Sequence, residues 1–417
     1  MSFQQGLSGL DAASTALDVI GNNVANASTV GFKSATPIFS DLYAASLGIV
    51  GASQVGIGVA VSSIQQQFTQ GNLTTTDNPL DLAINGGGFF RMSSDGAISY
   101  TRNGQFHIDK NGYVVNDQSQ RLTGYVAGTN GQISPSSPVD LQVSATQIPP
   151  RATSDPLAGD VAAQLNLDAR ETVPTVQPFD YTNPASYNFS TALTVYDSLG
   201  VAHNLTTFYV LNPPAPPGGG QWTVHATLDG ANPQTVPGGN LIFNTSGALT
   251  PAAAVHSLPS WNLVSGATTP WSPGTIDFSG TTQYGSQSTV ESLTQGGFAA
   301  GNLVGVGVAK DGIVQGRYSN GQTRSLAQIV LASFADPNGL LNIGNNQWTA
   351  TSASGPELVG TPASGSRGVV QSAAVEDSNV DLTAELVAMI TAQRNYQANA
   401  QTIKTQDQIM QTLINLR

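Results

Sequence analysis

Apolar residues recur with helical spacing over the first 33 positions. Intervals of three, four and seven residues separate Phe3, Leu7, Leu10, Leu17, Ile20 and Val24. Such intervals place side chains on one stripe of an α-helix. The opposite face holds small and polar residues, with Asp11 and Asp18 as the only charges before Lys33. A water-exposed helix face usually carries Lys, Glu and Arg. The pattern therefore predicts a helix that is surrounded by protein.

A second helix is predicted at the other end of the chain, from Ser378 to Arg417, where neither Gly nor Pro occurs. A four-three alternation runs through Leu382, Leu386, Met389, Gln393, Tyr396, Ala400, Ile403, Asp407, Met410 and Ile414. This is the heptad seam of a coiled coil with two polar interruptions. Ser378 and Asp381 fit a capping box at the helix start. We expect the two helices to pair, although two separate amphipathic helices packed on a core remain an alternative.

Between the helices the period changes to two, which is typical of strands. Asn-Gly and Asp-Gly pairs, the strongest short hairpin signals, recur at 85, 95, 103, 111 and 130, and again at 311, 320 and 338. A Pro-marked crossing near residue 145 introduces a second β-rich block, whose core we expect Trp222, Trp261 and Trp271 to anchor. The predicted fold is multi-domain and mainly β, with nested discontinuous β domains and paired helical termini.

This order of helices and strands predicts four nested parts of the chain. Residues 1–33 and 376–417 form a terminal coiled-coil domain, and residues 34–70 and 360–375 form connecting arms. Residues 71–145 and 286–359 form a first β domain, into which residues 146–285 are inserted as an outer β domain. The Gly-dotted arms could act as hinges, or could be simple linkers.

Composition limits the function classes. Only 10% of the 417 residues are charged, against about 25% in an average globular protein. The net charge of −12 argues against partners such as nucleic acid or an anionic membrane surface. There is no Cys, no run of about 18 apolar residues that would predict membrane insertion, and no signal-peptide pattern. An exported chain and a cytosolic chain would both fit these absences.

Catalytic motifs are missing as well. The four histidines, His107, His203, His225 and His256, form no H-x-x-H pair, and no G-x-S-x-G elbow occurs. The glycines at 86–88 precede a strand rather than a helix, so they predict a turn and not a phosphate loop. The sequence therefore predicts no catalytic, metal or cofactor site, and a protein that is not an enzyme.

Several motifs occur in a fixed order along the chain. The first runs Asn22-Asn23-Val24-Ala25-Asn26 and continues as Thr29-Val30-Gly31-Phe32-Lys33. Others lie at residues 68–73, 78–84, 87–90 and 100–106, and the last spans Ser378–Arg417. Together they resemble one bacterial family, the flagellar rod, hook and hook-associated proteins. The middle motifs are similar to the start of the family's first β domain, and the last is similar to its C-terminal helix. The family signature at the first helix thus includes Asn22, Asn23, Asn26, Gly31, Phe32 and Lys33.

This resemblance implies a helical tube whose inner layer is made of paired terminal helices. The large inserted block favours a hook subunit over the shorter rod proteins, which implies a curved, flexible coupling that passes torque from rod to filament. Implied partners are further copies of the chain, the distal rod protein, the hook cap protein, the hook–filament junction protein and the flagellar export apparatus. The implied location is extracellular, after export without a cleaved signal peptide.

Other interpretations of the chain stay open: it could be a distal-rod or hook-associated relative, or a secreted β-rich adhesin or enzyme. Within the hook interpretation, the apolar stripes of both helices are candidates for packing between subunits. Gly31 is expected to end the first helix and Phe32 to pack beyond it. Asn22, Asn23 and Asn26 either cap the helix end or bind backbone groups of adjacent subunits. Isolated helices are marginal in water, so we expect both ends to be disordered in the free subunit.

Overall fold

The computed structural model describes residues 2–42, 56–128, 131–143, 147–159, 161–213 and 220–415, with the backbone alone for residues 2 and 413–415. Ile414 of the predicted seam and Asn130 of the hairpin signals therefore lie outside the described side chains. The chain is mainly β with one helix at each end, as the sequence predicts. It divides into two compact units. The terminal unit comprises Met1–Ala145, Gly305–Arg317 and Thr323–Arg417, and the inserted unit comprises Thr146–Val304 and Tyr318–Gln322.

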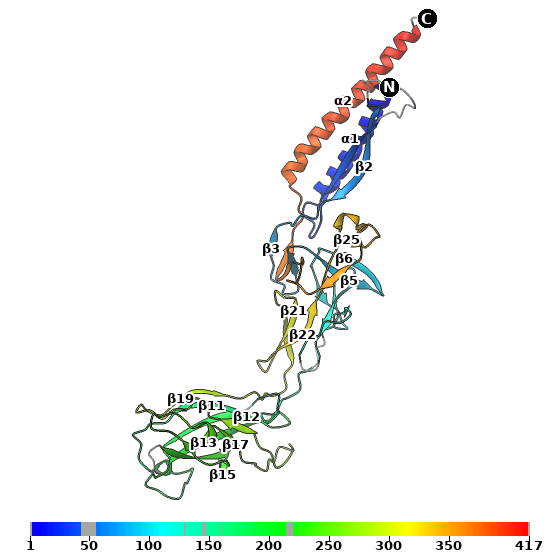
Figure 1. Ribbon diagram of the computed structural model, residues 1–417. Helices are drawn as coiled ribbons and strands as arrows, with labels where there is room; N and C mark the ends of the chain where they lie inside the picture. Colours follow the sequence, from blue (N-terminus) through cyan, green and yellow to red (C-terminus); the bar gives the residue numbers. More distant parts are fainter. Residues whose placement is uncertain are drawn as a thin grey trace. The chain divides into compact units, whose positions relative to one another are not determined.

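Two helices and a hairpin form one end of the terminal unit (Figure 1). Helix α1 (Ser2–Ala25) runs antiparallel to α2 (Leu382–Asn415), since Asn23 contacts Glu385 while Gly6 lies against Ile403. The hairpin consists of β1 (Ala35–Leu42) and β2 (Gly58–Gln66), paired antiparallel with a bulge between Ile38 and Phe39. The hairpin packs along α1, as Gln5 donates to the Gly56 carbonyl at 2.5 Å and the Val59 amide donates to Ser8.

The rest of the terminal unit is a β domain. Its main sheet has the order β20-β21-β22-β9-β5-β6-β25-β24. These strands are β5 (Phe89–Ser94), β6 (Ala97–Thr101), β9 (Arg121–Val126), β20 (Leu303–Val308), β21 (Ile313–Tyr318), β22 (Thr323–Ile329), β24 (Leu341–Gly344) and β25 (Gln347–Thr349). Shorter strands pair with its central strands β9 and β5 or with one another: β7 (His107–Ile108), β8 (Val114–Val115), β10 (Val139–Asp140), β23 (Leu331–Ser333) and β26 (Leu358–Gly360). Phe89, Tyr100, Phe334 and Trp348 build an aromatic core beneath it.

Two small sheets connect this β domain to α2. Strand β4 (Leu82–Asn85) pairs with β27 (Val369–Ser372), and β3 (Leu73–Thr75) pairs with β28 (Ala374–Glu376). The prediction that residues 360–375 form a connecting arm is therefore wrong for its second half, because residues 369–372 and 374–375 are strands paired with β4 and β3. The N-terminal arm is likewise a hairpin that packs on α1. Glycine spacing predicts turns, but it does not predict whether the segments between the turns pair with other strands or pack on a helix.

The inserted unit contains two sheets. One has the order β17-β18-β11-β19, and the other β12-β13-β14-β15, with β16 beside β14. The strands are β11 (Val161–Asn166), β12 (Phe189–Tyr196), β13 (Ala202–Leu211), β14 (Gln221–Leu228), β15 (Ala231–Thr235), β16 (Leu241–Ile242), β17 (Val255–Ser257), β18 (Thr275–Asp277) and β19 (Thr289–Thr294). Trp222, Trp261 and Trp271 are buried in one core, which confirms their predicted role. Three 3₁₀ turns complete the chain, at Pro184–Ser186, Pro251–Ala253 and Pro337–Gly339.

The predicted domain boundary at residue 285 is wrong. Strand β19 pairs antiparallel with β11, so the chain stays in the inserted unit until residue 304. The partner strand lies more than a hundred residues earlier, and local turn signals carry no information about such pairing.

Both helix boundaries also differ from the prediction. Asp381, not Ser378, caps α2, because its carboxylate accepts from the amides of Thr383 and Ala384 at 2.9 and 3.1 Å. Helix α1 ends at Ala25, six residues before Gly31. A turn follows in which the Asn26 side chain bonds back to the Asn22 carbonyl.

Candidate assembly interface

The two terminal helices meet through small residues. Gly6, Gly9 and Ala13 of α1 face Ala392 and Asn399 of α2, and we call these five residues the small-residue seam. A Cβ at Gly9 would lie 2.8 Å from Asn399 Nδ2, and one at Gly6 would lie 3.1 Å from Ile403 Cγ1. Glycine permits this close approach of two backbones. The seam uses little apolar surface, so most of the apolar side chains of both helices are left for other contacts.

Much of the apolar stripe predicted on α1 is left uncovered by the rest of the chain. Phe3 is 51% exposed and Leu7 46%, and the remaining members, Leu10, Leu17, Ile20 and Val24, are only partly buried. On α2, Leu382, Leu386, Tyr396 and Met410 of the predicted seam are exposed, and Met389 and Ile403 are partly buried. The two helices therefore pair as expected, with Ile403 lying against Gly6, but much of both stripes is left uncovered within one chain. A heptad pattern identifies an apolar stripe, but it cannot say which partner covers it.

Further apolar side chains are exposed beside these stripes. They are Val387, Ile390 and Ile409 on α2 and Ile38, Phe39 and Ile64 on the hairpin. Large apolar surfaces left uncovered on a folded chain commonly mark interaction sites. The helices and hairpin are therefore the candidate assembly interface of this chain.

A buried ion cluster fixes the root of this interface to the β domain. Lys33 Nζ lies 2.6 Å from Glu376 Oε1, and Arg102 Nη1 lies 3.0 Å from Glu376 Oε2. The side chains of Lys33 and Glu376 are 0% exposed. We call Lys33, Arg102 and Glu376 the junction cluster. It joins the turn after α1, the strand before α2 and the end of β6.

Backbone groups complete the junction cluster. Glu376 Oε1 also accepts from the Gly71 amide at 3.0 Å, and the Glu376 carbonyl accepts from the Gly31 amide at 2.7 Å. Lys33 Nζ donates to the Thr69 carbonyl, and Arg102 Nη2 to the Gly86 carbonyl. Burial lowers the pKa of Lys33 and of Arg102, and the Glu376 carboxylate opposes that shift. Because one carboxylate serves two buried cations, removal of Glu376 would leave both unpaired.

Sequence reasoning named Lys33 only as part of a family signature and missed Arg102 and Glu376 as its partners. The sequence could have pointed to these residues in one way. Charges are so scarce in this chain that any Lys or Arg inside an uncharged stretch is notable. Gly31 does not end α1. It has φ +73°, and a Cβ there would lie 2.5 Å from the Asn103 amide nitrogen, so it allows the turn to lie against the β domain. Phe32 is partly buried in the same turn.

Asn23 also acts within the chain rather than toward a neighbour. It is almost fully buried, and its amide Nδ2 donates to the Ala35 carbonyl at 2.8 Å and to Glu385 Oε1 at 2.9 Å. Its Oδ1 accepts from the Ala35 amide. Asn23 thus ties α1 to both β1 and α2. Buried Asn23 is therefore not available to an adjacent subunit. Asn26 is partly buried and donates to the Asn22 carbonyl, and Asn22 is exposed, so for these two a contact with an adjacent subunit stays a prediction.

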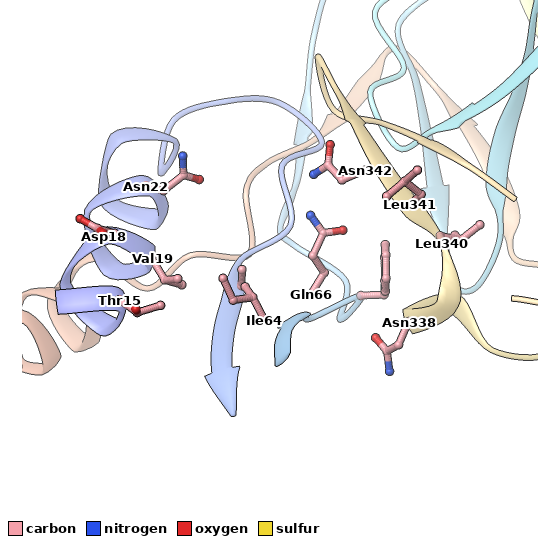
Figure 2. A pocket seen from close by; sticks show the side chains of 12 residues that line it. Thr15, Asp18, Val19, Asn22, Ile64, Gln66, Asn338, Leu340, Leu341 and Asn342 are labelled. Atoms are coloured by element: carbon pink, nitrogen blue, oxygen red, sulfur yellow. The ribbon is translucent and has the colours of Figure 1, made fainter. Parts of the chain in front are cut away.

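An open cavity of about 570 Å³ lies between α1, the hairpin and residues 338–342. Figure 2 shows Thr15, Asp18 and Asn22 on the helix, Ile64 and Gln66 on the hairpin, and Asn338, Leu341 and Asn342 across from them. Amides and apolar groups line it, with Asp18 as the one charged residue among them. Within the described ranges, no group of three or more His, Asp or Glu could hold a metal ion. In that same part of the chain, neither helix has an apolar run long enough to span a membrane.

Comparison with known proteins assigns the chain to a family. Four family models match it in order: flagella basal body rod protein at residues 3–33, flagellar hook protein FlgE/F/G D1 domain at 83–156, flagellar basal body protein FlaE D2 domain at 166–298, and flagellar basal body rod FlgEFG protein C-terminal at 371–416. The flagellar hook protein FlgE of Escherichia coli K12 is 43% identical over 425 residues, covering all of both chains. The chain belongs to the flagellar hook protein family.

Other members of the hook family match equally completely. The hook protein of Salmonella typhimurium LT2 is 42% identical over 425 residues, again with full coverage of both chains. Among solved structures, the hook protein FlgE2 of Helicobacter pylori aligns with a TM-score of 0.51 and 11% identity, covering 72% of this chain and 99% of that one. At that identity the alignment supports a shared fold only. As a member of the family, the chain is a component of the bacterial flagellum.

Proposed function

We propose that this chain is the structural subunit of a bacterial flagellar hook, polymerising into a curved, flexible tube that transmits torque from rod to filament. The observation that carries the proposal is the apolar surface left exposed on both terminal helices of a chain that belongs to the hook family. A helix that polymerises can leave its apolar stripe uncovered in one copy because the next copy covers it. The chain has no catalytic role in this proposal.

Its partners would be further copies of itself along the tube. The distal rod protein would adjoin it at the base, the hook cap protein at the growing end, and the hook–filament junction protein after completion. The subunit would leave the cell unfolded through the flagellar export apparatus, without a cleaved signal peptide. A chain without Cys suits that route, because no disulfide could form before transit.

Bending of a rotating curved tube requires contacts that lengthen and shorten once per turn. The charge-poor, Ser/Thr/Asn/Gln-rich β units suit contacts that slide, since shifted registers of weak polar contacts have similar energies. The hinge role first considered for the arms does not fit the paired strands and packed hairpin found there. Cross-linking the inserted units of adjacent subunits should stiffen the tube; an equally flexible cross-linked tube would contradict sliding contacts.

Electron microscopy of the purified full chain under polymerising conditions tests the proposed function. A hook subunit gives curved tubes of uniform diameter. A rod-type protein gives straight, stiff tubes, a junction protein gives rings or short stacks of few copies, and an adhesin or enzyme gives no regular polymer. Any of these three results would overturn the proposal.

A further inference from the structure

Two turns of the terminal unit repeat the same short motif. Residues 109–112 and 336–339 both read Asp-x-Asn-Gly. In each turn the Asp carboxylate accepts from the backbone amide of the Asn, at 2.8 Å for Asn111 and 3.0 Å for Asn338. The Gly amide donates to the Asp carbonyl, at 3.0 Å in the first turn and 3.2 Å in the second. Both turns therefore hold their Asn-Gly peptide bond in the same way.

The Asn side chains of these two turns are free. Asn111 and Asn338 are exposed, and within the part of the chain that the structure describes neither carboxamide has a hydrogen-bond partner. Asn338 lines the open cavity of Figure 2, so its side chain borders empty volume in which it can rotate. Rotation brings the Asn Cγ to the following amide nitrogen, and glycine has no Cβ to obstruct that approach.

Two other Asn-Gly pairs have the same sequence but bound side chains. Asn103 Oδ1 accepts from the Gln105 amide at 3.1 Å. Asn320 is bound at both ends of its carboxamide, because Oδ1 accepts from the Gln322 amide at 3.1 Å and Nδ2 donates to the Ala299 carbonyl at 2.7 Å. These bonds must break before either Cγ can reach the next amide nitrogen.

A further pair is held through its backbone. Asn85 lies at the end of β4, where it pairs with Val369 of β27, and the Gly86 amide donates to Gln70 Oε1 at 3.0 Å. Closing a ring at Asn85 would rotate a paired strand and take the Gly86 amide from its acceptor. Among the described Asn-Gly pairs, the two Asp-x-Asn-Gly turns thus have the least to break.

We propose that Asn111 and Asn338 are sites of spontaneous deamidation, with water as the only co-reactant. The Gly amide nitrogen, after losing its proton to hydroxide, attacks the Asn Cγ. A nitrogen–carbon bond forms, and the carboxamide nitrogen leaves as ammonia. Water then opens the cyclic succinimide at either carbonyl and gives aspartate or isoaspartate. Each event takes up one water and releases one ammonia, with no electron transferred.

The product at position 338 changes the chemistry of the cavity in Figure 2. Asp18 is the one charged residue among those that line it. A carboxylate at position 338 adds a second negative charge to these walls, and isoaspartate also lengthens the backbone of the turn that leads into β24. The product at position 111 lies in the turn between β7 and β8 instead.

Peptide mapping of the folded full chain tests the proposal. The chain is kept in mildly alkaline buffer and digested, and the Asn, Asp and isoaspartate forms of each Asn-Gly peptide are separated and quantified by mass spectrometry. Asn111 and Asn338 should convert about tenfold faster than Asn103 and Asn320, because the bound side chains must first lose hydrogen bonds. Comparable rates at all four positions, or a slow rate at either Asn111 or Asn338, would overturn the proposal.

The same chain unfolded in urea is the control for local sequence. Its four Asn-Gly pairs should convert at similar rates, because the native hydrogen bonds are lost. A difference that persisted in urea would come from neighbouring residues and would overturn the role given to the fold. Asn338→Gln is the matched variant: its longer side chain disfavours ring closure, so conversion at position 338 should nearly stop while Asn111 converts as before. Undiminished conversion at position 338 would overturn the cyclic route.

Discussion

Glu376 is the residue on which the junction between helices and β domain depends most. Its carboxylate is fully buried and serves Lys33 and Arg102 at once. Breaking a buried ion pair by removing one partner usually costs about 3–5 kcal/mol, because the remaining charge is left in a poorly solvating interior. Here two cations share one anion, so the cost of removing the anion falls at the upper part of that range.

We therefore expect Glu376→Gln to lower the free energy of unfolding of the terminal unit by about 3–5 kcal/mol. Urea denaturation followed by the helical circular dichroism signal, which comes from the two helices of the terminal unit, would measure it. Glu357→Gln is the matched control, since Glu357 pairs with Arg91 at 2.8 Å but its side chain is 30% exposed. In this control the free energy of unfolding should fall by about 1–2 kcal/mol. A loss for Glu376→Gln no larger than for the control would contradict the role given to the cluster.

Glu357 should also make stability depend on pH. Burial by itself raises its pKa, but hydrogen bonds from Arg91 and Tyr100 outweigh burial and hold the pKa below the usual 4.5. A carboxyl whose pKa is lower when folded stabilises the protein above its unfolded pKa, and loses that contribution as pH falls through the folded pKa. The stability difference between the unaltered chain and Glu357→Gln should thus shrink below pH 4.5. A constant difference down to pH 2.5, roughly, would contradict this.

Gly31 offers a third test at this scale. Gly31→Ala places a Cβ at φ +73°, 2.5 Å from a backbone nitrogen, and should destabilise the terminal unit by about 2 kcal/mol or more. Gly96→Ala is the control, because Gly96 also has positive φ but an added Cβ there meets no atom within 4 Å. Its cost should be about 1 kcal/mol. Thermal unfolding of both variants measures the difference in their destabilisation. That difference reports the effect of the close approach alone.

At the scale of elements, the helix pair and the β domain depend on different contacts. The helices meet through the small-residue seam, whereas the junction cluster holds the segments that follow α1 and precede α2. Removing residues 1–25 and 382–417 should therefore abolish polymerisation and leave a folded monomer, because Lys33 and Glu376 stay in place. Extending the first deletion to residue 33 should lower the unfolding temperature further. Sedimentation and circular dichroism distinguish the two truncated chains; equal unfolding temperatures would contradict the cluster's role.

At the scale of the whole molecule, each unit has a core of its own. Trp222, Trp261 and Trp271 lie in the core of the inserted unit, and Trp348 lies in the core of the terminal unit. Units with separate cores can unfold independently. We expect calorimetry to show two transitions, with Glu376→Gln lowering the temperature of only one. If both transitions moved together, or a single one appeared, the units would unfold as one.

The sequence determined the elements and the family. Helical spacing located both helices, Asn-Gly pairs and alternation located most strands, and the ordered motifs identified the flagellar axial family, because all these signals are local in the chain.

The tertiary structure alone decided which surfaces meet. The helices meet at the small-residue seam, where Ile403 of the predicted heptad stripe lies against Gly6, since glycine allows the closest approach of two backbones. Strand β19 joined β11, and Glu376 met Lys33 across more than three hundred residues. The packing of the whole chain selects such partners. Burial then makes the Lys33–Glu376 ion pair important for stability, although in the sequence these are only two charges far apart.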